Sequence, residues 1–318
     1  MMKKLLFLTM VLVLLMPAPA QAASEWDEAV TVYGAALESD QQLLDSTRGI
    51  LGTEESDKVE YVYSEDVQQY IGKDYSNAVL KSSIRIIQES QGHGLDITVD
   101  ESMGAITEIT EETYKNALLT SGITDAEVVI GAAEDVTGES ALSGIYKAYE
   151  SQGEAIDTER TQNSQEELEA ISSIAEENSN VEGFSQEQLN KMITDIKVEV
   201  INQGGDLAEQ EIRDIVDEQM AANGLDGLLT QEQIDRIVVI IIQIQDSGIF
   251  RSEEAERLKD SAQNLLDQIT SSEAFQNAAE QAESIGQDIQ ESSAWESFKK
   301  AASDFFDSIV SFFRSLFN

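Results

Sequence analysis

The 318-residue chain contains no cysteine, two prolines and a single histidine. Without cysteine it cannot form disulfide bonds, thiolate metal sites, a cysteine nucleophile or a lipid anchor on cysteine. Basic residues are also scarce, because 20 lysines and arginines stand against 61 aspartates and glutamates and leave a formal net charge of −41. Such a surface repels the phosphates of nucleic acids. We therefore expect no nucleic-acid partner.

The first 22 residues are typical of a cleaved secretory signal. Lys3 and Lys4 precede an apolar run over residues 5–16, and Ala20-Gln21-Ala22 provides a small-x-small cleavage site. This run is too short to cross a hydrocarbon core of about 30 Å. An uncleaved membrane anchor is the alternative interpretation. The sequence thus predicts a secreted, extracellular protein that can associate with the cell surface, and its acidity fits a saline or alkaline exterior.

Residues 23–160 alternate between short strand patterns and helical patterns. This predicts a mixed α/β sheet domain covered by helices. Val59, Tyr61 and Tyr63 are expected on the buried face of one strand. A hairpin is expected to turn at Gly92-His93-Gly94. The pattern predicts strands near 30–32, 59–63, 84–86, 95–99 and 128–130, and helices at 39–51, at 110–121 and from 139.

Residues 161–292 lack strand patterns and predict an all-α helical array, so the expected fold class is α+β followed by helices. Capping boxes are expected where Ser164, Ser185 and Thr230 each stand three residues before Glu or Gln. Glycines separate the apolar-periodic stretches and mark the ends of helices. We expect helices near 164–179, 185–202, 206–222 and 230–247, and a long one from 252.

The C-terminal segment, residues 293–318, predicts a strongly amphipathic helix. Residues 294–318 hold six of the ten phenylalanines, and their three acidic and three basic residues sum to zero. This segment could pack on its own helical array, lie in a membrane interface as a peripheral contact, or dock on a partner protein. The expected interaction residues are Trp295, Phe298, Phe305, Phe306, Ile309, Phe313, Leu316 and Phe317.

No catalytic residue can be assigned from motifs. His93 is flanked by glycines and reads as a turn residue, whereas the Gly138–Leu142 stretch lacks the second glycine of a nucleophile elbow. Among 61 carboxylates, pairs suited to glycoside hydrolysis are unavoidable and therefore not diagnostic. A hydrolase site, if there is one, is expected near His93, Glu111 or Glu112. No cofactor is expected, with diffuse calcium binding by surface carboxylates as an alternative.

Two strings in the first domain carry a family resemblance. They are ITEITEETYKNALLTSGI at residues 106–123 and GESALSGIYKAYE at residues 138–150. In these strings the chain resembles the YpuA-like family of secreted proteins of unknown function from Gram-positive bacteria. The resemblance covers roughly residues 29–155 and departs from the family at 34–38 and 132–134. It implies export and an envelope setting, and it carries no established activity or catalytic residue.

Together these patterns predict a secreted, envelope-associated interaction or structural protein that contacts an envelope component or partner protein. The alternatives are a carboxylate-dependent hydrolase of a cell-wall polymer and a calcium-binding surface protein. A deep cleft with two inward carboxylates and aromatic platforms would favour the hydrolase. An intact sheet without a cleft, together with an apolar C-terminal segment that lies free, would favour interaction.

Overall fold

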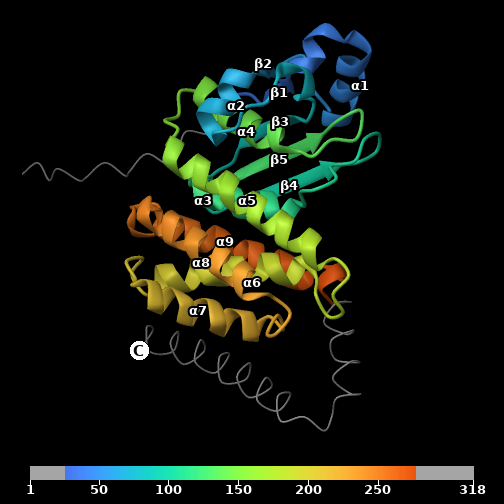
Figure 1. Ribbon diagram of the computed structural model, residues 1–318. Helices are drawn as coiled ribbons and strands as arrows, with labels where there is room; N and C mark the ends of the chain where they lie inside the picture. The colour runs from blue at the N-terminus through green and yellow to red at the C-terminus, as the bar shows by residue number, and fades with distance from the viewer. Residues whose placement is uncertain (1–25, 277–318) are drawn as a thin grey trace, which may run out of the picture.

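The computed structural model describes residues 26–276, in which a sheet part lies above a helical array in Figure 1. Its five-stranded mixed sheet has the order β2-β1-β3-β5-β4, with β1–β2 and β4–β5 parallel and the other two pairs antiparallel. All five predicted strands and the α+β fold class are confirmed. The strands are β1 (Val30–Gly34), β2 (Lys58–Val62), β3 (Ser83–Gln88), β4 (Leu95–Asp100) and β5 (Ala126–Gly131).

The predicted hairpin is wrong, because β5 lies between β3 and β4. Val128 of β5 is in register with Ile86 on one side and with Ile97 on the other. The apolar β5 gains most from a central place, whereas the alternating pattern of β4 suits a half-buried edge strand. The loop between β3 and β4 is held elsewhere, since Asp125 Oδ1 accepts hydrogen bonds from the backbone N–H groups of Gly92 and Gly94.

Helices cover both faces of the sheet. On one face α1 packs on β3 and β5, and on the other α4 packs on β1, β2 and β3. A Cβ at Gly144 of α4 would lie 3.3 Å from Ile84, so this position allows the helix a close approach to the sheet. The elements of this part are η1 (Ala35–Ser39), α1 (Gln41–Leu51), α2 (Ser64–Ile71), η2 (Asn77–Val79), α3 (Glu111–Ser121) and α4 (Glu139–Ser151).

The local signals of the sheet part have mixed outcomes. The ends of α3 are confirmed, since Thr110 caps the helix and Gly122 follows it at a φ of 88°. The face predicted for β2 is wrong, because Val59 is 42% exposed and Val62 is buried. Tyr63 lies outside β2 and is the N-cap residue of α2, a helix that the pattern did not predict.

The helical array consists of five helices in the described residues, and each was predicted. Two caps are confirmed, since Ser185 accepts a hydrogen bond from the Gln188 N–H and Thr230 accepts one from the Gln233 N–H. Their bounds are α5 (Thr158–Asn178), α6 (Gln186–Asn202), α7 (Glu209–Ala222), α8 (Gln231–Asp246) and α9 (Ala255–Ser271), with η3 (Ile249–Arg251) before α9.

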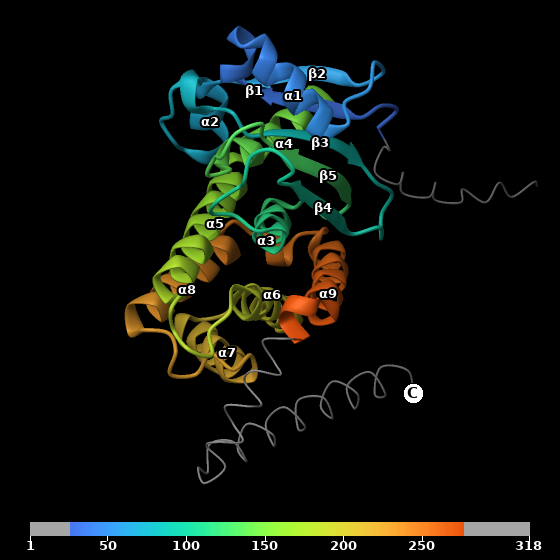
Figure 2. The ribbon, with the colours of Figure 1, turned by 90° about the vertical axis from the view of Figure 1, so that its right-hand side faces the viewer.

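Helix α5 begins earlier than expected and joins the two parts. Asp157 caps it, so the capping box predicted at Ser164 is wrong and Ser164 lies inside the helix. The helix starts before the predicted boundary at residue 160 and packs on α2 and α3 as well as α6 and α8, as Figure 2 shows. One hydrophobic cluster runs through both parts.

A buried polar network fills the junction of α3, α5 and α6. Glu167 and Lys197 form an ion pair at 2.6 Å with side chains that are 1% and 0% exposed. The Thr120 hydroxyl donates to Glu167, and the Lys197 ammonium donates to the backbone oxygen of Asn116 at 2.7 Å. Burial raises the pKa of Glu167 and lowers the pKa of Lys197, while the attraction within the pair opposes both changes.

Two predicted segments lie outside the described residues, namely the signal at 1–22 and the C-terminal helix at 293–318. The interaction residues from Trp295 to Phe317 are therefore outside them too. Within residues 26–276, no helix combines the length and the apolar character that a membrane span requires.

Candidate functional site

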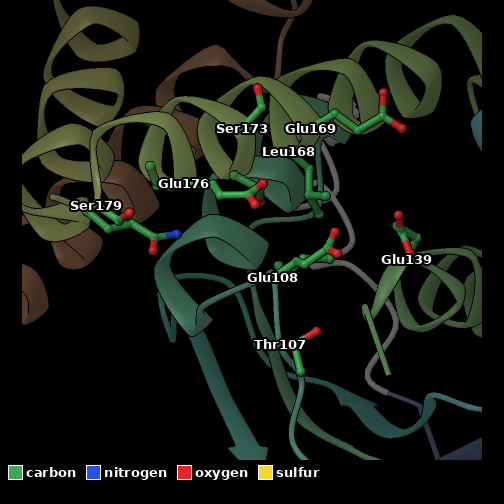
Figure 3. A pocket seen from close by; sticks show the side chains of 12 residues that line it. Thr107, Glu108, Glu139, Leu168, Glu169, Ser173, Glu176 and Ser179 are labelled. Atoms are coloured by element: carbon green, nitrogen blue, oxygen red, sulfur yellow. The ribbon is translucent and has the colours of Figure 1, made fainter. Parts of the chain in front are cut away.

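A cleft of about 650 Å³ opens beside the C-terminal half of α5, where this helix faces the start of α4 and the segment before α3 (Figure 3). Eight of its twelve lining residues carry a carboxylate or hydroxyl group, one is a glutamine and three are apolar. The lining residues are Thr107, Glu108, Ile109, Glu139, Leu168, Glu169, Ser172, Ser173, Ala175, Glu176, Ser179 and Gln186.

 Polar residues thus dominate the cleft, and four of them are glutamates.

The spacing of polar residues along α5 forms one wall of the cleft. Ser172 and Ser173 come three and four residues after Glu169, and Glu176 comes four and three residues after them, which places all four on one face of a helix. The opposite wall comes from parts of the chain far from α5. Glu108 precedes α3, and Glu139 is the first residue of α4. In Figure 3, Glu108, Glu139 and Glu176 border the space between these elements.

Negative charge in the cleft is only partly compensated. Glu169 pairs with Lys73 at 2.6 Å, whereas within residues 26–276 no lysine or arginine pairs with Glu108, Glu139 or Glu176. Burial, together with the charges of Glu139 and Glu176, raises the pKa of the Glu108 carboxyl above its ordinary value. The cleft therefore favours a cationic group.

A second, smaller hollow of about 280 Å³ adjoins the cleft, because Glu139 lines both. Tyr75 contributes a ring to this hollow, and its hydroxyl donates to Glu139 Oε1 at 3.3 Å. Burial and the neighbouring Glu139 charge raise the pKa of Tyr75 to about 12, so the phenol stays protonated and remains a donor. Lys81 and Glu134, which also line this hollow, form an ion pair.

The residues predicted for a hydrolase site do not meet in the cleft. Glu111 Oε1 accepts a hydrogen bond from the backbone N–H of Val99 near the end of β4, at 2.9 Å. His93 belongs to the turn before β4, and the glycines on both sides have positive φ, as a turn requires. His93, Glu111 and Glu112 line none of the cleft.

In the part of the chain that the structure describes, no group of three or more His, Asp or Glu side chains could hold a metal ion. Diffuse calcium binding stays a prediction. The arrangement can bind an ammonium group, and it can pair a carboxyl of raised pKa with a nearby carboxylate.

Comparison with known proteins places the chain in a family. It belongs to the family described as "Protein of unknown function (DUF1002)", whose model matches residues 33–265. It is also 30% identical over 274 residues to the uncharacterized protein YpuA of Bacillus subtilis (strain 168). This match covers 84% of this chain and 89% of that protein. No solved structure matches the chain.

These matches confirm the YpuA-like resemblance and extend it. The resemblance was based on residues 29–155, whereas the family match continues through the helical array to residue 265. The matched region therefore contains both walls of the cleft, including the whole of α5.

Proposed function

We propose that this protein is a secreted, envelope-associated binding protein whose cleft takes an amine-bearing, hydroxyl-rich glycan. The observation that carries the proposal is the set of three glutamates without a cationic partner in the described residues, Glu108, Glu139 and Glu176, around a space of about 650 Å³. Burial raises the pKa of Glu108, repulsion from Glu139 and Glu176 raises it further, and a ligand ammonium group would relieve that repulsion.

The other lining groups support a sugar ligand. Ser172, Ser173 and Gln186 can donate to and accept from sugar hydroxyls. Tyr75 in the adjoining hollow offers an aromatic ring on which a sugar can stack. The volume of the cleft falls within the usual range of ligand pockets, roughly 300–1,000 Å³. Two hollows that meet at Glu139 suit an extended chain of sugars better than a single small molecule.

The location within the cell rests on the sequence. The predicted signal at residues 1–22 supports export, and the Bacillus source of the similar protein fits a Gram-positive envelope. The neutral, phenylalanine-rich segment at 294–318 would add a second contact, to a partner protein or to the membrane surface.

The test measures the affinity of the full chain for a glucosamine tetramer and an N-acetylglucosamine tetramer by calorimetry at 150 mM salt. We expect the amine-bearing tetramer to bind at least tenfold more tightly. The double variant Glu139→Gln/Glu176→Gln should weaken its binding at least tenfold, because two carboxylates at the cleft are lost.

A matched control separates the cleft from the overall charge. The variant Glu55→Gln/Glu218→Gln removes the same charge from two exposed positions outside the cleft and should keep the affinity. Equal losses in both variants would contradict a cleft site and indicate non-specific attraction of a cation to an acidic surface. Deletion of residues 294–318 should leave tetramer binding intact and reduce retention on envelope fragments.

Hydrolysis of a cell-wall polymer is the second candidate function. The specific observation in its favour is the raised pKa of Glu108 beside Glu139 and Glu176, because a glycosidase needs one protonated and one ionised carboxyl. Release of reducing ends from purified wall glycan, lost in Glu108→Gln, would establish it. Binding without release would leave the protein a non-catalytic binder.

A further inference from the structure

Three side chains that can react with one another meet inside the molecule, where α3, α5 and α6 join. They are the Lys197 amine, the Asn116 side-chain amide and the Glu167 carboxyl, and these residues are 0%, 0% and 1% exposed. Lys197 Nζ lies 3.4 Å from Asn116 Oδ1 and 2.6 Å from Glu167 Oε1. The amine is therefore within reach of an amide carbonyl that it can attack and of a carboxyl that can take its proton.

The surroundings favour the uncharged forms of the amine and the carboxyl. Glu167 borders a small cavity whose eight other lining residues are alanine, leucine and isoleucine. Burial lowers the pKa of Lys197 and raises the pKa of Glu167. Transfer of one proton within the pair leaves a neutral acid and a neutral amine, and the neutral amine is the nucleophilic form of lysine.

Hydrogen bonds hold the Asn116 amide in one orientation beside this amine. Its Nδ2 donates to the backbone oxygen of Asn190 at 3.2 Å, and its Oδ1 accepts from the Thr194 hydroxyl at 3.0 Å. Lys197 Nζ donates to the backbone oxygen of Asn116 at 2.7 Å, which keeps the end of the lysine next to the amide. The Thr194 hydroxyl is a donor for the negative charge that develops on Oδ1 when the carbonyl is attacked.

We propose that Lys197 and Asn116 form an amide (isopeptide) bond between their side chains, with Glu167 as the proton carrier. The Lys197 ammonium gives one proton to Glu167, and the free amine attacks Asn116 Cγ. A bond forms between Nζ and Cγ, and the bond between Cγ and Nδ2 breaks. Glu167 relays a proton from the attacking nitrogen to Nδ2, so ammonia leaves and Glu167 stays protonated. The step needs no oxidant and no cofactor.

The bond ties the two parts of the molecule together. It joins α3, which belongs to the sheet part, to α6 of the helical array, between residues 81 positions apart in the sequence. A chain without cysteine cannot make such a link as a disulfide. Cross-links that close long loops constrain the unfolded chain strongly. The proposal is independent of the glycan proposed for the cleft.

The test is mass spectrometry of the denatured full chain, because an ion pair does not survive denaturation and an amide bond does. We expect a mass lower than that of the unlinked chain by about 17 Da, the mass of one ammonia. Digestion should release one branched peptide that contains both Asn116 and Lys197. Its fragment spectrum separates it from a succinimide, which loses the same mass within a single peptide. Trypsin should not cleave after Lys197, because the acylated side chain has lost its charge.

Substitutions identify the groups that react. Lys197→Met and Asn116→Ala should each restore the full mass, and Glu167→Gln should reduce the yield of the branched peptide at least tenfold. Lys191→Met is the matched control, because Lys191 also lies on α6 and pairs with a carboxylate, that of Asp195 at 2.7 Å. It should keep the mass deficit and the branched peptide.

The unsubstituted chain decides the outcome even if a variant does not fold. A full mass without a branched peptide would overturn the proposal. A mass deficit that resides in one linear peptide would also overturn it, because that result is a succinimide. An undiminished yield of branched peptide in Glu167→Gln would overturn the role of Glu167 as proton carrier.

Discussion

Helix α5 carries glutamates in two opposite settings. On its buried face Glu167 is surrounded by a lysine, a threonine hydroxyl and apolar side chains, whereas on its cleft face Glu176 has no cationic partner in the described residues. The difference follows from desolvation, since a carboxylate taken out of water needs a partner and one beside water does not. A chain with only 20 basic residues thus uses one of them fully inside the molecule.

The largest effect is expected when the buried glutamate loses its lysine. Lys197→Met should lower the free energy of unfolding by about 3–5 kcal/mol, because it leaves Glu167 buried without a counter-charge. Urea unfolding followed by circular dichroism measures this. The double variant Glu167→Gln/Lys197→Met should recover part of the loss, and a double variant no more stable than Lys197→Met would contradict the explanation.

A smaller effect is expected from one hydroxyl. Thr120→Val keeps the side-chain shape and removes the donor to Glu167, so it should cost about 1–3 kcal/mol. Thr137→Val is the matched control, because Thr137 is exposed and its hydroxyl donates to Glu139 at the cleft. Its cost should stay below about 0.5 kcal/mol. Similar losses of stability in the two variants would show that a hydroxyl bonded to the buried Glu167 contributes no more than one bonded to Glu139 at the cleft.

The smallest effect is expected at the cleft and has the opposite sign. Glu108→Gln should raise the free energy of unfolding at pH 7 by about 0.2–1 kcal/mol, because it removes repulsion from Glu139 and Glu176. The folded protein raises the pKa of Glu108, so its contribution to stability is most favourable below its unfolded pKa, roughly 4.3, and declines as the pH rises through the folded pKa.

The pH dependence provides the check on this variant. The advantage of Glu108→Gln should therefore shrink towards zero when unfolding is repeated near pH 4. Glu218→Gln, at an exposed position on α7, should change stability little at either pH. An advantage that persists undiminished at low pH would mean that repulsion of an ionised Glu108 is not its cause.

Local signals predicted most elements, and long-range contacts account for the errors. Thr110 and Gly122 mark the two ends of α3 within the helix itself, so the sequence around them suffices. The letters at Ser164 and Glu167 match a cap equally well, yet Asp157 starts the helix earlier and Glu167 is buried against a lysine of α6. Nothing near Glu167 in the sequence indicates that Lys197 lies against it.

Only the α5 wall of the cleft could be predicted from the sequence. The polar spacing along α5 from Glu169 to Glu176 is readable as an exposed helix face. Glu108 and Glu139 join that face through the packing of α3 and α4, which no local pattern encodes. The same limit explains the wrong hairpin, because the sequence shows that β3 and β4 are strands without showing what lies between them.

The central position of β5 has a consequence for how the chain assembles. The two strands that flank β5 in the sheet, β3 and β4, both precede it in the chain and are therefore synthesised first. The edges that they present to β5 have no partner until residue 131 has been made. Unpaired edges of this kind attract other strands. Newly made chains are therefore prone to aggregate through these edges until β5 pairs with both β3 and β4.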